Sequence, residues 1–205
     1  MKQFLIIWLA VMITDNLLPF ILAQYYNGYD HKKMVLSVLG CKQSPVKWYY
    51  NIWCIISGIV FVIAAFKIHS FFSGRLSLVV CILVVIYGFG CEIISGLFPL
   101  NENRENQDTC SKIHGIGSAL GFTSLLFCPL LLGIAAFMAD LCVLGTVCIL
   151  SFVAAFTFFT FFILGEKEKF SQTALQYGGL WQRLTLAFTY IPFIWLVIST
   201  LQHSL

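Results

Sequence analysis

The stretch LSLVVCILVVIYGFGCEIISGL, residues 76–97, decides the fold class, because Glu92 is its one charged residue. An α-helix rises about 1.5 Å per residue, so a run of this length crosses the roughly 30 Å hydrocarbon core of a bilayer. Backbone polar groups meet no water at that depth, and a helix pairs them within a single segment. The stretch therefore predicts a transmembrane helix.

Five further apolar runs of similar length predict that the whole chain, residues 1–205, is one all-α, polytopic transmembrane bundle. Hydrophobic residues make up 60% of the sequence and charged residues 10%, whereas a soluble domain carries about 25% charged residues. The mean hydropathy is +0.90. The six predicted spans cover about residues 4–23, 52–68, 76–97, 115–138, 141–164 and 184–201.

The first of these spans has a rival interpretation as a cleaved signal peptide, with Lys2 before an apolar core and Ala23 in the cleavage region. Ile21 is too large for the small residue that such a cleavage site requires. Asp15 and Asn16 also interrupt the apolar core. We therefore expect this span to belong to the bundle.

Six spans leave two short connections, 67–75 and 139–140, and three longer polar ones. The longer connections, residues 24–51, 99–114 and 165–183, must share one face, opposite both termini, which we call the loop-rich face. Three of the basic residues, Lys2, Lys67 and Arg75, lie on the other face. By the positive-inside rule, the remaining nine place the loop-rich face in the cytoplasm; they are Lys32, Lys33, Lys42, Lys47, Arg104, Lys112, Lys167, Lys169 and Arg183.

Of the eight cysteines, Cys41 and Cys110 lie outside the predicted spans, both on the loop-rich face. They are a candidate disulfide if that face is in an oxidising compartment. The alternative is two unrelated free thiols. The cysteines within the spans are expected to act as small apolar residues.

Four motifs occur in a recognisable order: YNGYDHKKMVLSVLG at 26–40, SGLFP at 95–99, IHG at 113–115 and GLWQR at 179–183. Their order resembles a family of bacterial and archaeal membrane proteins catalogued as domain of unknown function 998 (DUF998). The resemblance implies six transmembrane helices and no established activity. A more distant similarity is to eukaryotic DRAM-like and Frag-like proteins, whose first loop faces the lumen. That similarity would put the loop-rich face outside, against the charge count, so the orientation stays open.

Two acids, Asp15 and Glu92, lie within predicted spans, where an ionised side chain at mid-helix costs roughly 2.5–3.5 kcal/mol on insertion scales. His114 and Arg183 begin the fourth and sixth spans at the loop-rich face. All four therefore lie in the same half of the bilayer. We expect them to form a polar binding pocket that is open toward the loop-rich face and capped by the first loop. The alternative is a purely structural network of the same groups.

Three functions fit such a pocket. The first is a protein that binds a membrane lipid or a protein partner. The second is a membrane-embedded enzyme acting on lipid or glycolipid, with His114 as general base and Asp15 or Glu92 orienting it. The third is a small proton-coupled transporter with Glu92 as the titrating group. No cofactor, metal or nucleic-acid partner is expected, because the sequence contains no phosphate-binding loop, zinc motif or basic stripe.

Overall fold

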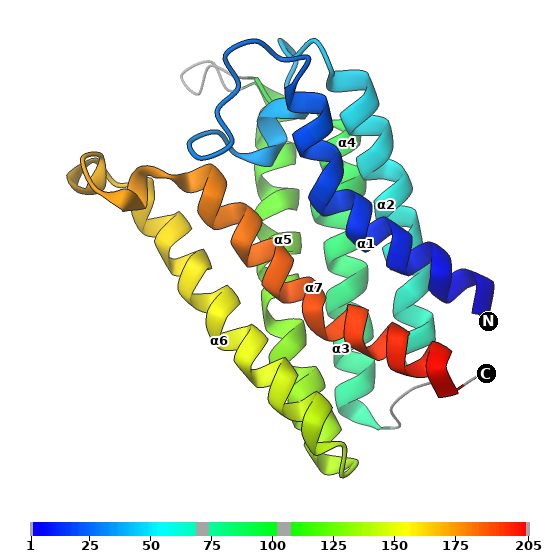
Figure 1. Cartoon of the computed structure of the whole chain (residues 1–205). Helices are drawn as coiled ribbons and strands as arrows, with labels where there is room; N and C mark the ends of the chain where they lie inside the picture. The colour runs from blue at the N-terminus through cyan, green and yellow to red at the C-terminus, as the bar shows by residue number, and fades with distance from the viewer. Residues whose placement is uncertain (1, 69–73, 102–107, 204–205) are drawn as a thin grey trace.

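The computed structural model describes residues 2–68, 74–101 and 108–203, and this part of the chain folds into helices and loops without a strand (Figure 1). The six helices among the described residues are each long and apolar enough to span a bilayer. They are α1 (Lys2–Ala23), α2 (Lys47–Ile68), the continuous α3 (Arg75–Ile86), η2 (Tyr87–Ile94) and α4 (Ser95–Leu97), then α5 (Thr109–Met138), α6 (Cys142–Gly165) and α7 (Gly178–His203). The predicted all-α polytopic bundle is confirmed, and the chain is a multi-pass membrane protein.

Three helices begin earlier than hydropathy predicts: α2 at Lys47 rather than near 52, α5 at Thr109 rather than 115, and α7 at Gly178 rather than 184. Their first turns carry polar and aromatic residues that belong to the membrane interface, beyond the hydrocarbon core. The start of α5 is fixed by Asp108, whose side chain accepts a hydrogen bond from the Ser111 backbone nitrogen at 2.9 Å. This is a helix N-cap, which satisfies a backbone donor that has no partner inside the helix.

The described parts of the longer connections gather at the top and upper left of Figure 1, whereas the two chain ends lie together at the lower right. The first connection contains the short helix η1 (Leu36–Gly40), and the last contains η3 (Glu168–Phe170) and η4 (Ala174–Gln176). This arrangement agrees with the topology expected for six spans. The loop-rich face is one end of the bundle.

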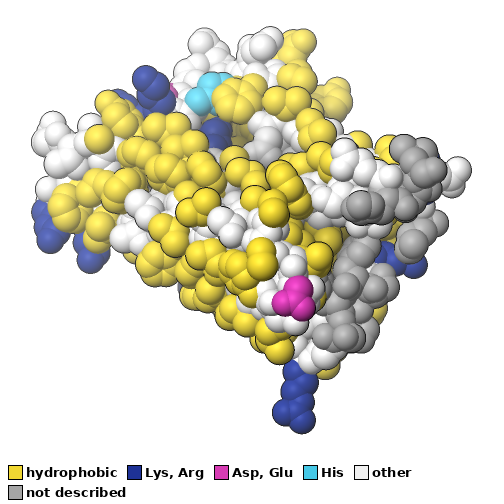
Figure 2. All heavy atoms as spheres, turned by 60° about the horizontal axis from the view of Figure 1, so that its bottom comes forward, with side chains coloured by type: hydrophobic (Ala, Val, Ile, Leu, Met, Phe, Trp, Pro, Cys, Tyr) yellow, Lys and Arg dark blue, Asp and Glu magenta, His cyan; other side chains and the backbone are white. Residues whose placement is uncertain are grey.

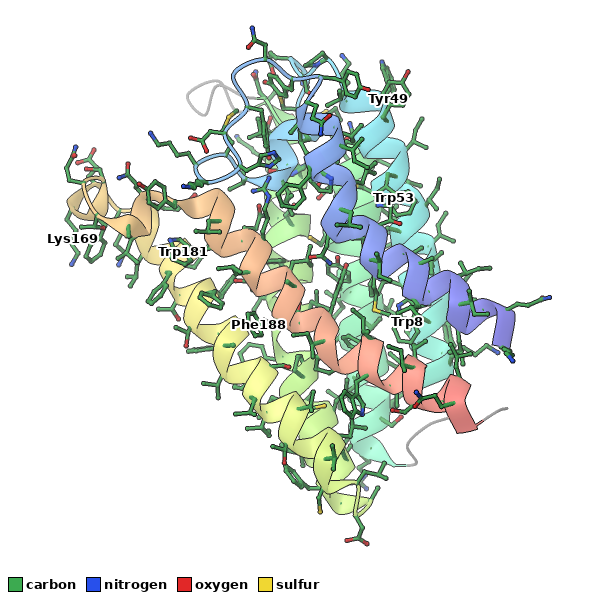
Figure 3. The ribbon with its side chains drawn as sticks, viewed as in Figure 1. Trp8, Tyr49, Trp53, Lys169, Trp181 and Phe188 are labelled. Carbon is green, nitrogen blue, oxygen red and sulfur yellow. The ribbon has the colours of Figure 1, made fainter. Side chains whose placement is uncertain are left out.

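Large aromatic side chains from four helices meet in the core. The indole of Trp8 on α1 lies 6.2 Å from the Phe61 ring on α2 and 5.7 Å from the Phe193 ring on α7. Phe61 also stacks on Tyr190 at 5.3 Å and meets Tyr87 of η2 edge-on at 5.0 Å. All five side chains are fully buried. Figure 3 shows Trp8 between α1 and α7, with Trp181 and Phe188 along the side of α7 that faces α6.

The outer surface of the bundle is hydrophobic. Figure 2 shows a face covered mainly by apolar side chains, with few charged groups among them. Exposed isoleucines, leucines and phenylalanines occur on all six helices. Such a surface suits lipid chains, which tolerate apolar residues that water would not.

Small residues let two pairs of helices cross closely. Gly90 of η2 faces Gly117 of α5, where an added β-carbon would lie 2.8 Å from the Gly117 carbonyl oxygen. Gly88 faces Gly58 of α2, where an added β-carbon would lie 2.8 Å from the Gly58 carbonyl oxygen. Small residues at helix crossings are the usual means of close packing in membranes. These crossings hold η2 between α2 and α5.

Residues Tyr87–Ile94 form a π-helical segment within the third span. Each π-helical turn takes in an extra residue, so side chains after it are rotated relative to a regular α-helix. Glu92 lies in this segment, with Gly88 four residues and Gly90 two residues before it. Segments of this kind occur often at functional sites, and this one sets the direction of Glu92.

Candidate functional site

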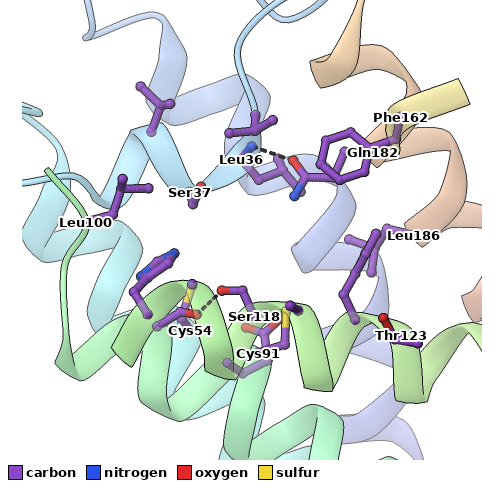
Figure 4. A pocket seen from close by; sticks show the side chains of 18 of the residues that line it. Leu36, Ser37, Cys54, Cys91, Leu100, Ser118, Thr123, Phe162, Gln182 and Leu186 are labelled. Carbon is purple, nitrogen blue, oxygen red and sulfur yellow. Dashed lines mark hydrogen bonds between the residues drawn. The ribbon is translucent and has the colours of Figure 1, made fainter. Parts of the chain in front are cut away.

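A cavity of about 490 Å³ lies at the loop-rich end of the bundle, between η1, α2, η2, α5, α6 and α7 (Figure 4). Its lining includes polar side chains, among them Asn51, Glu92, His114 and Ser118. On the side of α5 and α6, Phe122, Phe159 and Phe162 line it. The cavity therefore brings hydrogen-bonding groups and an aromatic wall together.

The aromatic end of the cavity reaches the outer surface between α5 and α6. Gly115, Ala119 and Thr123 line it from α5 and are exposed, and their spacing of four residues places them on one stripe of the helix. Ile163 lines the α6 side and is also exposed. The opening faces the side of the bundle, where lipid surrounds a membrane protein.

The first loop forms the cap of the cavity. The η1 residues Leu36 and Ser37 line it, and Figure 4 shows them across the cavity from Ser118 and Cys91. The backbone nitrogen of Leu36 donates to the Gln182 side-chain oxygen on α7 at 2.7 Å. At the other end of η1, the Asn51 amide of α2 donates to the Gly40 carbonyl at 3.0 Å. Two helices thus hold the cap in place.

Glu92 and Asp15 are joined by two tyrosines. The Tyr87 hydroxyl lies 2.7 Å from Glu92 Oε1 and 2.6 Å from the Tyr190 hydroxyl. Tyr190 lies 2.8 Å from Asp15 Oδ2. The four side chains come from α1, η2 and α7, so this chain of hydrogen bonds crosses the bundle core. Only Glu92 and Tyr87 of the four line the cavity.

Asp15 has two further donors, both from α2. The Trp53 indole nitrogen donates to Oδ1 at 2.6 Å, and the Ser57 hydroxyl donates to Oδ2 at 2.9 Å. The Asp15 side chain is 9% exposed. A buried carboxyl without a cation beside it depends on such donors, so Asp15 is a central connection between α1, α2 and α7.

His114 lies in the first turns of α5 and lines the cavity. Its Nδ1 lies 3.0 Å from the Phe98 carbonyl oxygen. Because a carbonyl can only accept, Nδ1 carries the hydrogen, and in the neutral imidazole Nε2 is then an acceptor. A turn further along α5, Ser118 shares a hydrogen bond of 2.8 Å with Ser95. The main-chain carbonyl orients His114, where the sequence had suggested an acid.

Arg183 is absent from the cavity lining and instead fixes the first loop. Its guanidinium donates to the carbonyls of His31 and Met34 at 2.9 and 3.1 Å, and to the Tyr29 hydroxyl at 2.7 Å. Burial raises the pKa of Tyr29, and the Arg183 charge opposes that rise. Burial, with the same charge, lowers the pKa of His31. Glu92 and His114 therefore line the cavity, Asp15 is linked to Glu92 through the two tyrosines, and Arg183 lies apart from all three.

Cys41 and Cys110 are both free thiols in the structure, and Cys41 is buried. An ion pair between Lys42 and Asp108 lies close to both cysteines in the sequence. The hydrogen bond from Lys42 strongly lowers the pKa of Asp108, and the same hydrogen bond raises the pKa of Lys42. This pair joins the first loop to the start of α5.

Sequence reasoning missed Tyr87, Tyr190, Trp53 and Ser57. One signal was present: Tyr87 and Tyr190 lie well inside apolar spans, whereas membrane tyrosines concentrate at the interfaces. A hydroxyl at that depth needs a partner, and the two buried acids are the partners. Among the described residues, no group of three or more His, Cys, Asp and Glu side chains is placed to hold a metal ion.

No curated protein and no solved structure matches the chain. The model of one family, described as "Protein of unknown function (DUF998)", matches residues 7–201 and thus nearly the whole chain. The match takes in all the helices that build the cavity, together with the first loop that caps it. The chain therefore belongs to the DUF998 family of membrane proteins.

Proposed function

We propose that this protein binds an amphipathic lipid of its own bilayer in the cavity, with the headgroup beside Glu92 and His114. The observation that carries the proposal is the composition of the cavity, whose lining combines the polar Asn51, Glu92 and His114 with three phenylalanines of α5 and α6. A lining with polar and aromatic parts matches a molecule with a polar head and an apolar chain. The proposed location is the cell membrane.

The size and position of the cavity support a lipid. Ligand pockets range from roughly 300 to 1,000 Å³, and the cavity volume of about 490 Å³ lies within that range. The volume suits a headgroup with the first part of one chain. The rest of the chain would leave between α5 and α6, past Ala119 and Ile163, into the surrounding bilayer. A lipid reaches this opening by lateral diffusion, without entering water.

Native mass spectrometry with extraction of bound lipid tests the proposal. We expect wild-type protein to retain a defined lipid, and Glu92→Gln and His114→Ala to retain less of it while still folded. Ala119→Phe should block the opening, because Ala119 is exposed at the mouth of the cavity. Met138→Phe adds the same ring to α5 at a position that is 76% exposed and away from the cavity.

The control should behave as wild type. Equal retention by wild type, Ala119→Phe and Met138→Phe would contradict the proposal. It would direct attention to a protein partner on the outer surface of the bundle.

One observation favours a second candidate, a membrane-embedded enzyme acting on lipid or glycolipid. His114 lines the cavity with its Nε2 as an acceptor, the form that a general base requires. An enzyme should lose turnover of the retained lipid in His114→Gln and keep its binding. Unchanged lipid after long incubation with wild-type protein would leave binding as the function.

A further inference from the structure

The series of hydrogen bonds that links Asp15 to Glu92 requires a fixed number of hydrogen atoms. Three oxygen–oxygen contacts, of 2.8, 2.6 and 2.7 Å, link Asp15 to Tyr190, Tyr190 to Tyr87 and Tyr87 to Glu92. Each contact needs one hydrogen between its oxygens. The two tyrosine hydroxyls supply two of the three. The third must come from a carboxyl, so at least one of the two acids is protonated.

The surroundings decide which acid holds the charge. Asp15 accepts hydrogen bonds from the Trp53 indole and the Ser57 hydroxyl in addition to Tyr190. A carboxylate at Glu92 would have two donors, Tyr87 and the Cys54 thiol, and a thiol is a weak donor. More and stronger donors favour the charged form. At rest, therefore, Asp15 carries the negative charge and Glu92 carries the proton.

The other titratable groups around Glu92 do not supply a positive charge. They are Tyr50 and Cys54 on α2, Cys91 and Tyr87 on η2, His114 on α5, Tyr190 on α7, Asp15 on α1 and Glu166 at the end of α6. No Lys or Arg is among the residues that line the cavity in the described part of the chain. An anionic headgroup would meet no opposite charge here, whereas a cationic one would meet an acid.

Resting on the proposed lipid site, we infer that the cavity selects an amphiphile with a protonated amine headgroup, which binds Glu92 while the Glu92 proton passes to Asp15. The ammonium group stabilises a carboxylate at Glu92, so the proton that Glu92 held at rest is now more stable on Asp15. A charge-assisted hydrogen bond then forms between the headgroup nitrogen and Glu92 Oε1 or Oε2.

The transfer balances without any outside group. The O–H bond of Glu92 breaks and its proton joins the Tyr87 oxygen. The Tyr87 proton passes to Tyr190, and the Tyr190 proton passes to Asp15 Oδ2. The pair carries one negative charge before and after the transfer, so no proton enters or leaves the protein. All four oxygens are already in hydrogen-bond contact, so the transfer needs no rearrangement of the bundle.

Infrared spectra of the protein in lipid nanodiscs test the resting state first. With the aspartate carboxyl carbons labelled by ¹³C, protonated Asp and Glu side chains give separate carbonyl bands. We expect one protonated glutamate band near neutral pH that disappears in Glu92→Gln, and no protonated aspartate band. Absence of the glutamate band, or its survival in Glu92→Gln, would overturn the inference without bearing on lipid binding.

Dodecylamine then tests the headgroup, with dodecanol and dodecanoate as probes of equal chain length. A charge-assisted hydrogen bond adds about 1.5–3 kcal/mol, so the amine should bind about tenfold more tightly than the alcohol or better. Phosphatidylethanolamine has an amine beside a phosphate. If it binds, the natural source is a phospholipid, and if it does not bind while dodecylamine does, the natural source is a single-chain amine. Amine binding should replace the protonated glutamate band by a protonated aspartate band.

Tyr87→Phe removes one hydroxyl from the hydrogen-bond series and provides the decisive comparison. Tyr190→Phe removes the other hydroxyl and replaces the first variant if that variant misfolds. In these variants the Glu92 proton cannot reach Asp15, so about one proton per bound amine should be released to the buffer. Calorimetry in buffers of different ionisation enthalpy measures this number, and wild type should release none.

Equal affinity for amine and alcohol in wild-type protein would overturn the headgroup assignment. Retention of a native lipid in that case would show that the proposed binding function itself still holds. Loss of lipid from every preparation, together with the expected resting bands, would instead place the failure in the proposed function.

Discussion

Asp15 and Glu92 are both buried carboxyls, yet Asp15 is surrounded by three donors, from Trp53, Ser57 and Tyr190. A neutral amide at position 92 can donate to Tyr87 as a protonated acid does. Glu92→Gln should therefore change the free energy of unfolding by less than about 1 kcal/mol. Asp15→Asn removes the charge and leaves an amide among groups that donate to a carboxylate, at a cost of about 1–3 kcal/mol.

Thermal or denaturant unfolding in one fixed detergent compares the two variants. Asp15→Glu is a useful third variant, because it retains the charge and alters only the length of the side chain. The interpretation of the pair is contradicted if Glu92→Gln is the more destabilising of the two amide substitutions.

Hydropathy predicts the helices of this chain well, because length and apolar composition alone determine which segments cross a bilayer. Hydropathy does not predict the π-helical segment Tyr87–Ile94. Its extra residue per turn depends on how η2 fits between Gly58 of α2 and Gly117 of α5. Those contacts link distant parts of the sequence, and no local pattern encodes them.

The crossing of η2 and α5 offers a matched pair of substitutions on one helix. In Gly117→Ala the new β-carbon would lie 2.7 Å from the Gly90 carbonyl oxygen, so the helices must move apart. In Gly115→Ala it would meet nothing within 4 Å. We expect Gly117→Ala to destabilise the protein by about 1–3 kcal/mol and Gly115→Ala to be neutral or slightly stabilising.

Unfolding of the two alanine variants and wild type in the same detergent measures the difference. Equal stability of the two variants would show that η2 and α5 are less closely packed than the structure indicates. A loss in both variants would point to helix flexibility, and the crossing would then not explain the effect.

The start of α5 depends on Asp108, which caps the helix and pairs with Lys42 of the first loop. The folded-state pKa of Asp108 lies below the unfolded value, since Lys42 and Ser111 donate to the carboxylate. Its contribution to stability is therefore fully present above the unfolded pKa, about 3.9, and is lost as the pH falls through the lower folded value.

Hydrogen exchange of the first α5 turn checks this expectation. In Asp108→Asn the exchange should be several-fold faster near neutral pH, because the ion pair with Lys42 is lost. Asn is itself a good N-cap, so the helix should still begin at the same residue. Lys42→Met should have a similar effect on exchange without touching the cap. Equal exchange near neutral pH in wild type, Asp108→Asn and Lys42→Met would show that the ion pair does not stabilise the start of α5.

At the scale of the whole molecule, the number and order of spans follow from the sequence, whereas the composition of the cavity does not. Asp15, Glu92 and His114 stand out individually because ionisable groups are rare in spans. Their arrangement depends on helix packing. Arg183 illustrates the limit: its position at the start of the sixth predicted span suggested the cavity, but the carbonyls of His31 and Met34 engage it. Unpaired carbonyls in a loop leave no mark in hydropathy.

The orientation of the bundle is the last prediction. By sequence, nine of the twelve Lys and Arg residues belong to the loop-rich face, with Arg104 among them outside the described residues, and the positive-inside rule predicts that this face is in the cytoplasm. The exposed positions Ser171, between α6 and α7, and Ala139, between α5 and α6, lie at opposite ends of the bundle. Each receives a single cysteine in a background where Cys110 and Cys142 are replaced by serine.

An impermeant maleimide on intact cells should label Ala139→Cys and leave Ser171→Cys unlabelled until the cells are opened. The serine background without a new cysteine measures residual labelling of the native thiols. The opposite pattern would place the loop-rich face, with Cys41 and Cys110, outside the cell. The cap of the cavity would then face the exterior. The lateral opening between α5 and α6 would admit lipid from the outer leaflet rather than the inner one, because it lies in the same half of the bundle as the cap.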